Sequence, residues 1–158
     1  GSFFVFLTAQ TPRSAITSVR ADIAEADAYK AALLRREIGL QAPAGSNVPG
    51  VDFITAAINA STGRMEVIIT DVKASTVGRF PTPVTTIKPS WMAEVQAAVS
   101  ANRLSLGNPS VELQIQQAVA RGDVVLRQVN VDYSSTPQGQ GTMTGFGPLP
   151  LPLPLPGL

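Results

Sequence analysis

The sequence contains no cysteine and no histidine. Without cysteine there is no disulfide framework, no thiolate nucleophile and no zinc site built on thiolates. Without histidine there is no member of the residue type that most often serves as general base and metal ligand near neutral pH. Serine-protease triads, HEXXH zinc sites and histidine-dependent nucleases are therefore excluded. Any catalysis must use carboxylates, lysine, arginine, tyrosine or hydroxyl groups, together with an oxygen-binding metal such as magnesium.

Long apolar runs and an excess of one charge are also absent. No apolar run reaches the roughly 18–20 residues that a membrane-spanning helix needs, so we expect no membrane span. The apolar run at residues 3–9 is short and lacks the basic flank of a signal peptide. Twelve basic and eleven acidic residues nearly cancel, which argues against a large phosphate-binding surface. The initial Gly1-Ser2 pair is typical of an expression-vector remnant, so we expect a domain taken from a longer protein.

The chain of 158 residues, 44% of them hydrophobic, is long enough for one domain with a core. A helix over residues 17–36 is expected to bury a stripe made of Val19, Ile23, Ala26 and Leu33. Two later helices are expected, one after a Ser90 cap and one from Asn108-Pro109 to Gly122. The remaining elements expected are a hairpin over residues 50–72 and a strand over residues 123–134. This order predicts an α/β domain with a central sheet.

The chain is expected to divide at residue 140. Residues 1–140 would form the domain, and residues 141–158 a Gly/Leu/Pro-rich extended tail. Prolines at alternate positions of the tail block both helix formation and ladder pairing, so a polyproline-II-like conformation is expected. Docking of its leucines on the domain or on a partner and a flexible end are both compatible with this composition.

The hairpin carries carboxylates where a purely structural strand would favour apolar residues. Asp52 precedes the apolar run of the first arm, and Asp71 and Lys73 lie in the second arm. Side chains alternate across a sheet, so Asp71 and Lys73 share one face. Neighbouring strands lie about 4.8 Å apart, which allows Asp52 and Asp71 to hold one ion if the register brings them level. A slip of one residue would put them on opposite faces.

Two carboxylates and a lysine supply the groups that phosphodiester hydrolysis needs. The carboxylates bind a magnesium ion that also contacts phosphate oxygens. The lysine orients or deprotonates the attacking water and offsets the charge that develops on the phosphate. The alternative interpretation is structural: Asp71 and Lys73 form an ordinary ion pair on one face, and Asp52 caps the turn after Pro49-Gly50.

The arrangement of Asp52, a hairpin, and then Asp71-Val72-Lys73 resembles the PD-(D/E)xK nuclease superfamily. The segments "REIGLQAPAGSNVPGVDFITA" and "EVIITDVKASTVGRFPTP" are further similar to nuclease domains at the C-termini of bacterial polymorphic toxins, of the Rhs-type and contact-dependent kinds. The resemblance covers about residues 25–133. It implies a restriction-endonuclease-like fold, a central mixed β-sheet flanked by helices. In this sequence the Pro-Asp pair of the family is spread over Pro49 to Asp52.

The resemblance also implies roles for individual residues. Asp52, Asp71 and the backbone carbonyl of Val72 would bind Mg²⁺ (Mn²⁺ is possible), and Lys73 would be the catalytic lysine. The family usually adds a glutamate from the first helix. We assign it to Glu37, because continuing the helical period places Glu37 in line with the buried stripe. Glu25, about 120° away on the helix and expected to be exposed, is kept as the alternative.

The resemblance and the local charges also suggest how substrate would be bound. Arg79 and Lys88, in the loop after the motif, are candidates for contacts to the phosphate backbone, and Ser75 for a hydrogen bond to a phosphate. For each of these three residues an ordinary loop or turn role is the alternative. If the first helix ends before Glu37, that residue is expected to be a solvated acid.

We therefore expect a magnesium-dependent endonuclease, with DNA favoured over tRNA as substrate, that acts as an antibacterial effector toxin. The resemblance implies secretion as part of a larger effector, action in the target-cell cytoplasm, and a cognate immunity protein as partner. The alternative is a non-catalytic binding module in which the Asp/Lys cluster is a structural ion-pair network. A glycosidase working through two carboxylates would leave Lys73 without a role and would want more aromatic residues than the 6% present.

Overall fold

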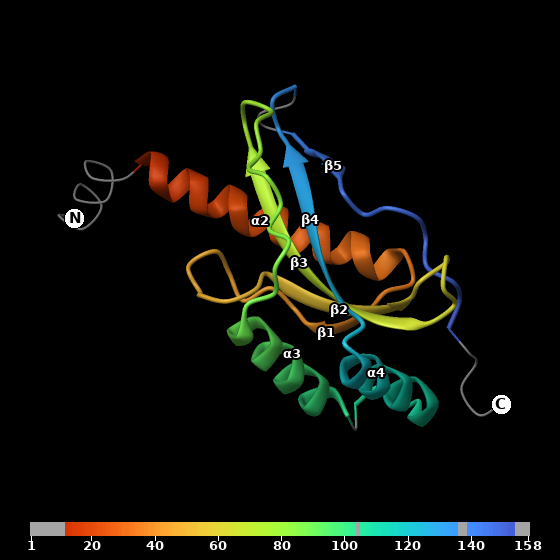
Figure 1. The fold of residues 1–158 in the computed structure, drawn as a ribbon. Helices are drawn as coiled ribbons and strands as arrows, with labels where there is room; N and C mark the ends of the chain where they lie inside the picture. Colours follow the sequence, from red (N-terminus) through yellow and green to blue (C-terminus); the bar gives the residue numbers. More distant parts are fainter. Residues whose placement is uncertain (1–11, 104, 136–138, 154–158) are drawn as a thin grey trace.

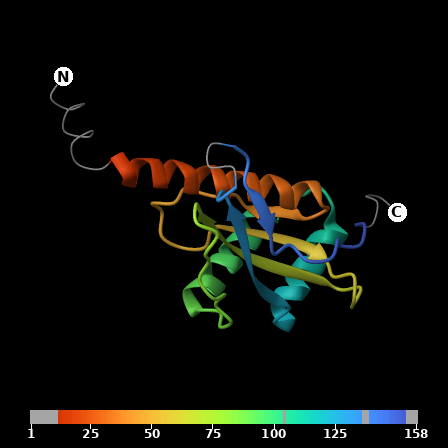
Figure 2. The same ribbon diagram turned by 90° about the horizontal axis from the view of Figure 1, so that it is seen from above.

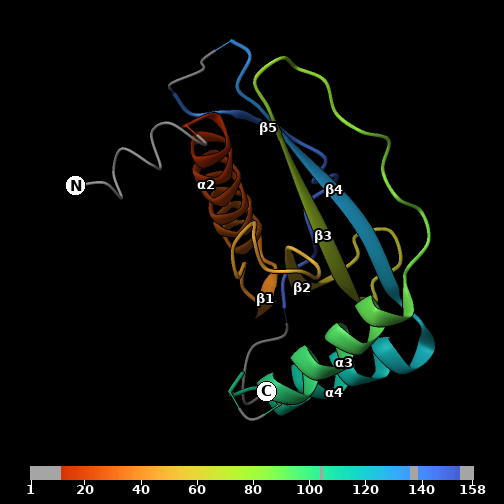
Figure 3. The same cartoon turned by 90° about the vertical axis from the view of Figure 1, so that its left-hand side faces the viewer.

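The computed structural model describes residues 12–103, 105–135 and 139–153. These residues form an α/β fold in which one five-stranded mixed sheet has helices on both faces. Helix α2 (Pro12–Leu34) lies along one face, and α3 (Pro89–Asn102) and α4 (Pro109–Arg121) cover the other (Figure 1, Figure 2 and Figure 3). The expected fold class is confirmed, and the architecture is consistent with a restriction-endonuclease-like fold. The apolar run at residues 3–9 lies outside the described residues.

The strands follow their sequence order across the sheet, β1-β2-β3-β4-β5. Only β3 and β4 pair in parallel, and the crossover between them contains α3 and α4. Every other neighbouring pair of strands is antiparallel. The strands are β1 (Ile38–Gln41), β2 (Phe53–Ile58), β3 (Met65–Ser75), β4 (Val124–Asp132) and β5 (Thr142–Thr144).

The expected hairpin is confirmed as β2 and β3. Its ladder runs from the pair Ile58 and Met65 at the turn to the pair Phe53 and Thr70 at the open end. The Asn59 side chain holds the turn by accepting hydrogen bonds from the backbone of the following residues. Strand β3 continues past this open end, beside β4 (Figure 1). From Asp71 onward, β3 is therefore paired on one side only, with β4.

The face under α3 and α4 holds the larger hydrophobic core. Alternate residues of the hairpin point into it and meet the apolar stripes of both helices. Helix α4 begins and ends as expected: the Asn108 side chain accepts from the Val111 N–H, and Gly122 ends the helix in the left-handed conformation. The expected Ser90 cap of α3 is wrong, because the helix begins at Pro89 and the N-cap position is Lys88.

The other face is covered by a stripe of small residues on α2. Ala24, Ala28 and Ala32 are fully buried against the sheet. The stripe expected from the larger apolar residues is wrong: Val19 and Ile23 are 57% and 50% exposed, and Ala26 and Leu33 also face solvent. Alanine allows the helix backbone to approach the sheet closely, whereas the larger side chains of this helix point away from it.

Helix α2 ends at Leu34, and Arg36 adopts a positive φ of 75° just beyond it. The chain then turns into β1, so Glu37 does not continue the helix. That corrects the reasoning by which Glu37 was placed on the helical stripe. Glu37 is nevertheless 5% exposed, so the alternative of a solvated acid is also wrong.

The stretch after residue 140 is part of the domain as far as residue 153. Strand β5 pairs with β4, and the Leu151 N–H donates to the Ile58 carbonyl at 3.0 Å. Between them, the Phe146 ring lies under the guanidinium groups of Arg35 and Arg127, at 5.1 and 4.8 Å from its centroid. We call residues 142–151 the strap. As far as residue 153, the segment expected to be an extended tail therefore docks on the domain, which was one of the two alternatives; residues 154–158 lie outside the described chain.

Within the described residues, no helix combines the length and the apolar character needed to cross a membrane.

Candidate active site

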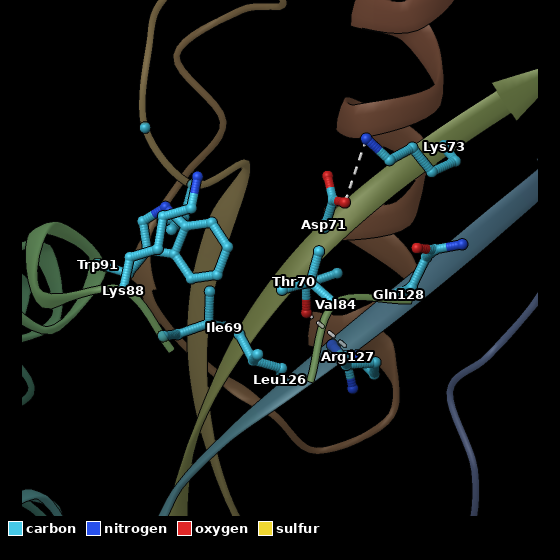
Figure 4. A pocket seen from close by; sticks show the side chains of 12 residues that line it. Ile69, Thr70, Asp71, Lys73, Val84, Lys88, Trp91, Leu126, Arg127 and Gln128 are labelled. Atoms are coloured by element: carbon cyan, nitrogen blue, oxygen red, sulfur yellow. Dashed lines mark hydrogen bonds and ion pairs between the residues drawn. The ribbon is translucent and has the colours of Figure 1, made fainter. Parts of the chain in front are cut away.

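The two hairpin aspartates lie at the open end of the β2–β3 ladder. Asp52 directly precedes β2, and its Oδ2 accepts a hydrogen bond of 2.6 Å from the Val72 backbone N–H. Asp71 follows the last ladder pair on β3, and its Oδ2 lies 3.2 Å from the Nζ of Lys73 (Figure 4). The register, which the sequence left open, therefore brings Asp52, Asp71 and Lys73 together, and no slip separates the two acids.

The backbone of Val72 faces the same place. Along a strand, the N–H and C=O of one residue point to the same side and alternate between residues. Val67 donates to the Asp123 carbonyl, so odd-numbered residues of β3 point to the β4 side and even-numbered ones to the β2 side. At Val72, beyond the last residue of β2, the N–H meets Asp52. Its carbonyl oxygen is thus directed to the Asp52 side, where the sequence expectation placed a metal ligand.

The pKa values of both aspartates are raised above the ordinary value of an aspartate side chain. Burial, with the neighbouring Glu25 carboxylate as second cause, raises the pKa of Asp52 to about 6. Burial and the nearby Asp52 raise the pKa of Asp71, and Lys73 opposes this shift. Two close carboxylates in a partly buried place disfavour each other's charged form, and a cation relieves that repulsion.

Glu25 is the acid that α2 brings to this site. It was expected to be exposed, but it is 5% exposed and lies within hydrogen-bonding reach of Asp52. The expectation failed because it took Val19, Ile23 and Leu33 as the buried side. The alanine spacing at 24, 28 and 32 was the available signal, since Glu25 adjoins that stripe.

Glu37 belongs to a different cluster. Its carboxylate accepts two hydrogen bonds from Arg127, at 2.7 and 2.9 Å, and one of 2.6 Å from the Thr55 hydroxyl. Arg35 adds an ion pair at 3.2 Å. The Glu37 side chain is fully buried and each of its oxygens is occupied. The structure therefore does not bring Glu37 to Asp52 and Asp71, which corrects the choice made from helical periodicity.

Arg127 is the residue of this second cluster that sequence reasoning missed. Besides Glu37, its guanidinium donates to the Thr70 hydroxyl at 3.1 Å and covers the Phe146 ring. Arg35 donates to the carbonyls of Gly147 and Pro148. The available signal was an arginine directly after the apolar residues 124–126 of the last predicted strand. The cluster joins β1, β2, β3, β4 and the strap, which indicates a structural role.

A cleft of about 240 Å³ opens beside Asp71 and Lys73. Ile69, Leu126 and Val84 give it apolar walls, and Trp91, Lys88 and Gln128 line it as well (Figure 4). The Lys88 Nζ lies 5.0 Å from the centroid of the Trp91 ring. Lys88 thus lines the cleft beside Asp71, and its role as a phosphate contact stays a prediction.

The other two predicted substrate contacts are placed differently. The Ser75 hydroxyl accepts hydrogen bonds from the backbone N–H groups of Val77 and Arg79, at 3.1 and 3.2 Å. Ser75 therefore forms the turn after β3, the alternative role foreseen for it. Arg79 is exposed in that turn and does not line the cleft.

The donor set fits magnesium better than a metal held by protein ligands alone. In the described part of the chain, no group of three or more acidic residues is arranged to hold a metal ion. Magnesium, however, usually binds one or two carboxylates and completes its shell with waters and substrate phosphate oxygens. Asp52, Asp71 and the Val72 carbonyl provide such an incomplete oxygen set.

No protein-family model matches the chain, and neither the curated proteins nor the solved structures contain a match. The PD-(D/E)xK resemblance therefore remains a prediction from the sequence motif.

Proposed function

We propose that the chain is a magnesium-dependent nuclease domain that hydrolyses phosphodiester bonds. The observation that carries the proposal is the meeting of Asp52 and Asp71 at the open end of the hairpin, with Lys73 in contact with Asp71. The pKa values of both aspartates are raised, which is typical of functional groups, and Asp71 lines a cleft. The site also adjoins a cleft lined by a lysine and a tryptophan, as a nucleic-acid substrate would require.

Each residue would have a defined task. Asp52, Asp71 and the Val72 carbonyl would hold Mg²⁺, which supplies positive charge to the phosphate oxygens when bound. Lys73 would orient or deprotonate the attacking water and donate a hydrogen bond to the phosphate as its charge increases. Glu25 would accept hydrogen bonds from water beside Asp52. Lys88 would bind a neighbouring phosphate through its exposed ammonium group.

The biological setting is proposed from the sequence resemblance. The domain would be an antibacterial effector, secreted within a larger protein, active in the target-cell cytoplasm and neutralised by a cognate immunity protein. DNA is favoured over tRNA as substrate. The near balance of twelve basic and eleven acidic residues supports a small contact with the nucleic acid rather than an extended one.

The test is cleavage by the purified chain. Plasmid DNA and total RNA are incubated with it in MgCl₂ and, separately, in EDTA. We expect magnesium-dependent degradation of one of them, and loss of that activity in Asp71→Ala and Lys73→Ala. Asp123→Ala is the matched control, because Asp123 pairs with Arg64 and Arg121 on the surface at the other end of β4. Equal cutting by the parent and the Asp71 and Lys73 variants would refute the proposal.

The second candidate is a non-catalytic binding module. It is favoured by the exposure of the Asp71–Lys73 pair, whose side chains are 46% and 41% exposed, because pairs of this kind are common on protein surfaces. On this interpretation, neither nucleic acid is degraded and neither Mg²⁺ nor Mn²⁺ binds in a manner that depends on Asp52.

A further inference from the structure

The cleft beside Asp71 has the composition of a binding pocket for one flat ring. One part of its lining is apolar, from Ile69, Leu126 and Val84. Trp91 and Lys88 lie on one side and Gln128 on the other, with Asp71 nearby (Figure 4). Its volume of about 240 Å³ is below the roughly 300–1,000 Å³ of pockets for drug-sized ligands. The space suits a single base rather than a base pair.

Trp91 provides a stacking surface in this pocket. Its ring is only partly buried by the core under α3, and it also lines the cleft. Stacking of a base on an aromatic ring is a main source of affinity for single-stranded nucleic acids. The Lys88 ammonium lies over this ring, 5.0 Å from its centroid, so a base stacks there when this flexible side chain turns to the phosphate attached to the base.

Gln128 provides a hydrogen-bond acceptor. Its Nε2 donates to the Pro81 carbonyl and to Asn130 Oδ1, each at 2.9 Å. These two bonds use both hydrogens of the amide, so Oε1 is the atom left for a ligand. Figure 4 shows that oxygen on the side of Asp71. An acceptor at this place selects a base that presents an amino group, such as cytosine, over uracil or thymine, which present a carbonyl there.

We propose that this pocket holds one unstacked nucleobase next to the cleaved phosphate, with Trp91 stacking on it and Gln128 Oε1 accepting from its amino group. The inference rests on the proposed nuclease function and adds the substrate class. The substrate would be a strand with an unpaired base, and the pocket would prefer a base that carries an amino group. An enzyme that acts in such a pocket requires a single-stranded or locally opened substrate, since a base within a duplex does not reach it.

The single tryptophan of the chain makes the binding directly measurable, because all tryptophan fluorescence comes from Trp91. The parent protein is titrated in EDTA with cytidine monophosphate, uridine monophosphate and ribose 5-phosphate, and free tryptophan corrects for absorption. We expect saturable quenching by both nucleotides, several-fold tighter binding of the cytidine nucleotide, and no quenching by ribose 5-phosphate. Quenching by ribose 5-phosphate at similar affinity, or by none of the three, would overturn the inference.

Substitutions separate recognition of the base from structural effects. Gln128→Leu is expected to remove the preference for cytidine over uridine monophosphate while binding of the uridine nucleotide persists. Gln96→Leu, at an exposed position of α3 outside the pocket, is the matched control and keeps the preference. Trp91→Leu is expected to weaken the binding of both nucleotides about ten-fold or more, as measured by calorimetry. A preference that survives Gln128→Leu would exclude the assigned role of that residue.

Cleavage distinguishes this inference from the function on which it rests. On single-stranded oligonucleotides, we expect cuts next to cytosine or adenine in the parent and loss of that preference in Gln128→Leu, whereas Gln96→Leu keeps both the cleavage and the preference of the parent. Magnesium-dependent cleavage without base preference and without quenching would overturn the pocket and leave the nuclease proposal intact. Quenching that follows the expected order without any cleavage would support the pocket and refute the nuclease proposal.

Discussion

The carboxylate of Asp52 accepts a 2.6 Å hydrogen bond from the backbone N–H of Val72, on the opposite arm of the hairpin. A backbone donor fixes the acid more firmly than a flexible side chain would, and it sits between the motif residues Asp71 and Lys73. The relative position of the two acids is therefore determined by the hairpin itself. Their closeness has a cost in stability, which leads to the first prediction.

Asp52→Asn should be more stable than the parent protein above about pH 6. The pKa of Asp52 in the folded state is about 6, above its ordinary value of 3.8, so the folded state binds the proton more tightly than the unfolded state. Stability from this group is complete below pH 3.8 and is lost as the pH rises through about 6. Asparagine keeps an acceptor for the Val72 N–H and has no charge to lose. A gain of 1 kcal/mol would raise Tm by about 2–4 °C.

Thermal melting of both proteins at pH 5 and pH 8 measures this effect. The difference between them should grow with pH. Asp123→Asn is a control in which the change in stability should have the opposite sign. The hydrogen bond from Arg121 lowers the pKa of Asp123, so removing this carboxylate charge should reduce stability at pH 8. A parent protein as stable as Asp52→Asn at both pH values would contradict the prediction.

Magnesium should raise the Tm of the parent protein, because an ion that binds only the folded state stabilises it by mass action. The rise should disappear in Asp71→Asn and become smaller in Glu25→Gln, whose carboxylate lies beside Asp52. Glu37→Gln should keep it, since Glu37 is enclosed by Arg127 and Thr55. Thermal shift with increasing MgCl₂ and MnCl₂ tests all four proteins. A shift lost in Glu37→Gln but kept in Glu25→Gln would reverse the assignment of the helix acid.

Arg127→Leu should lower the free energy of unfolding by about 3–5 kcal/mol, because it leaves the buried Glu37 carboxylate without its main partner. Replacing both residues by leucine should cost clearly less than the sum of the two single replacements. Urea unfolding of the two single variants and the double variant gives the coupling energy. Additive losses would show that the two side chains act independently.

Gly145→Ala should detach the strap. Gly145 has a φ of 116°, and a Cβ there would collide with the Gln128 backbone carbonyl oxygen. Gly147 is the matched control: its φ is 71°, but a Cβ would meet no atom within 4 Å. Alanine at Gly147 should cost about 1–2 kcal/mol for the backbone alone, and alanine at Gly145 clearly more. Urea unfolding compares them, and equal losses would mean that the strap contact contributes little.

Features set by neighbouring residues could be predicted from the sequence. The hairpin, both later helices and β4 follow from local periodicity and turn residues, whereas the register that brings Asp52 level with Asp71 was left open and comes from the structure. The buried side of α2 was mispredicted, because the small alanines pack against the sheet while Val19 and Ile23 face solvent. Burial there depends on the sheet surface and not on residue hydrophobicity alone.

Contacts between distant parts of the chain could not be predicted, because they leave no pattern in the local sequence. Glu37 is buried because Arg127, far along the sequence, lies opposite it, and neither residue has a neighbour that reveals the pairing. The sequence of the strap predicted an extended segment but left open whether it docks, because nothing near Phe146 in the chain shows that this ring lies under two guanidinium groups. The cleft at Trp91 likewise arises only when the loop before α3 folds across β4.

The alanines of α2 act as a spacer as well as a packing surface. Their short side chains set the height of the helix above the sheet, and Glu25 leaves the same helix toward Asp52. A valine at Ala24 or Ala28 would lift the helix and withdraw Glu25, even though neither alanine touches a reacting group. Substitutions that fill the space between this helix and the sheet are thus expected to weaken the proposed metal binding at Asp52. The position of the Glu25 carboxylate therefore depends on the size of the alanine side chains on the same helix.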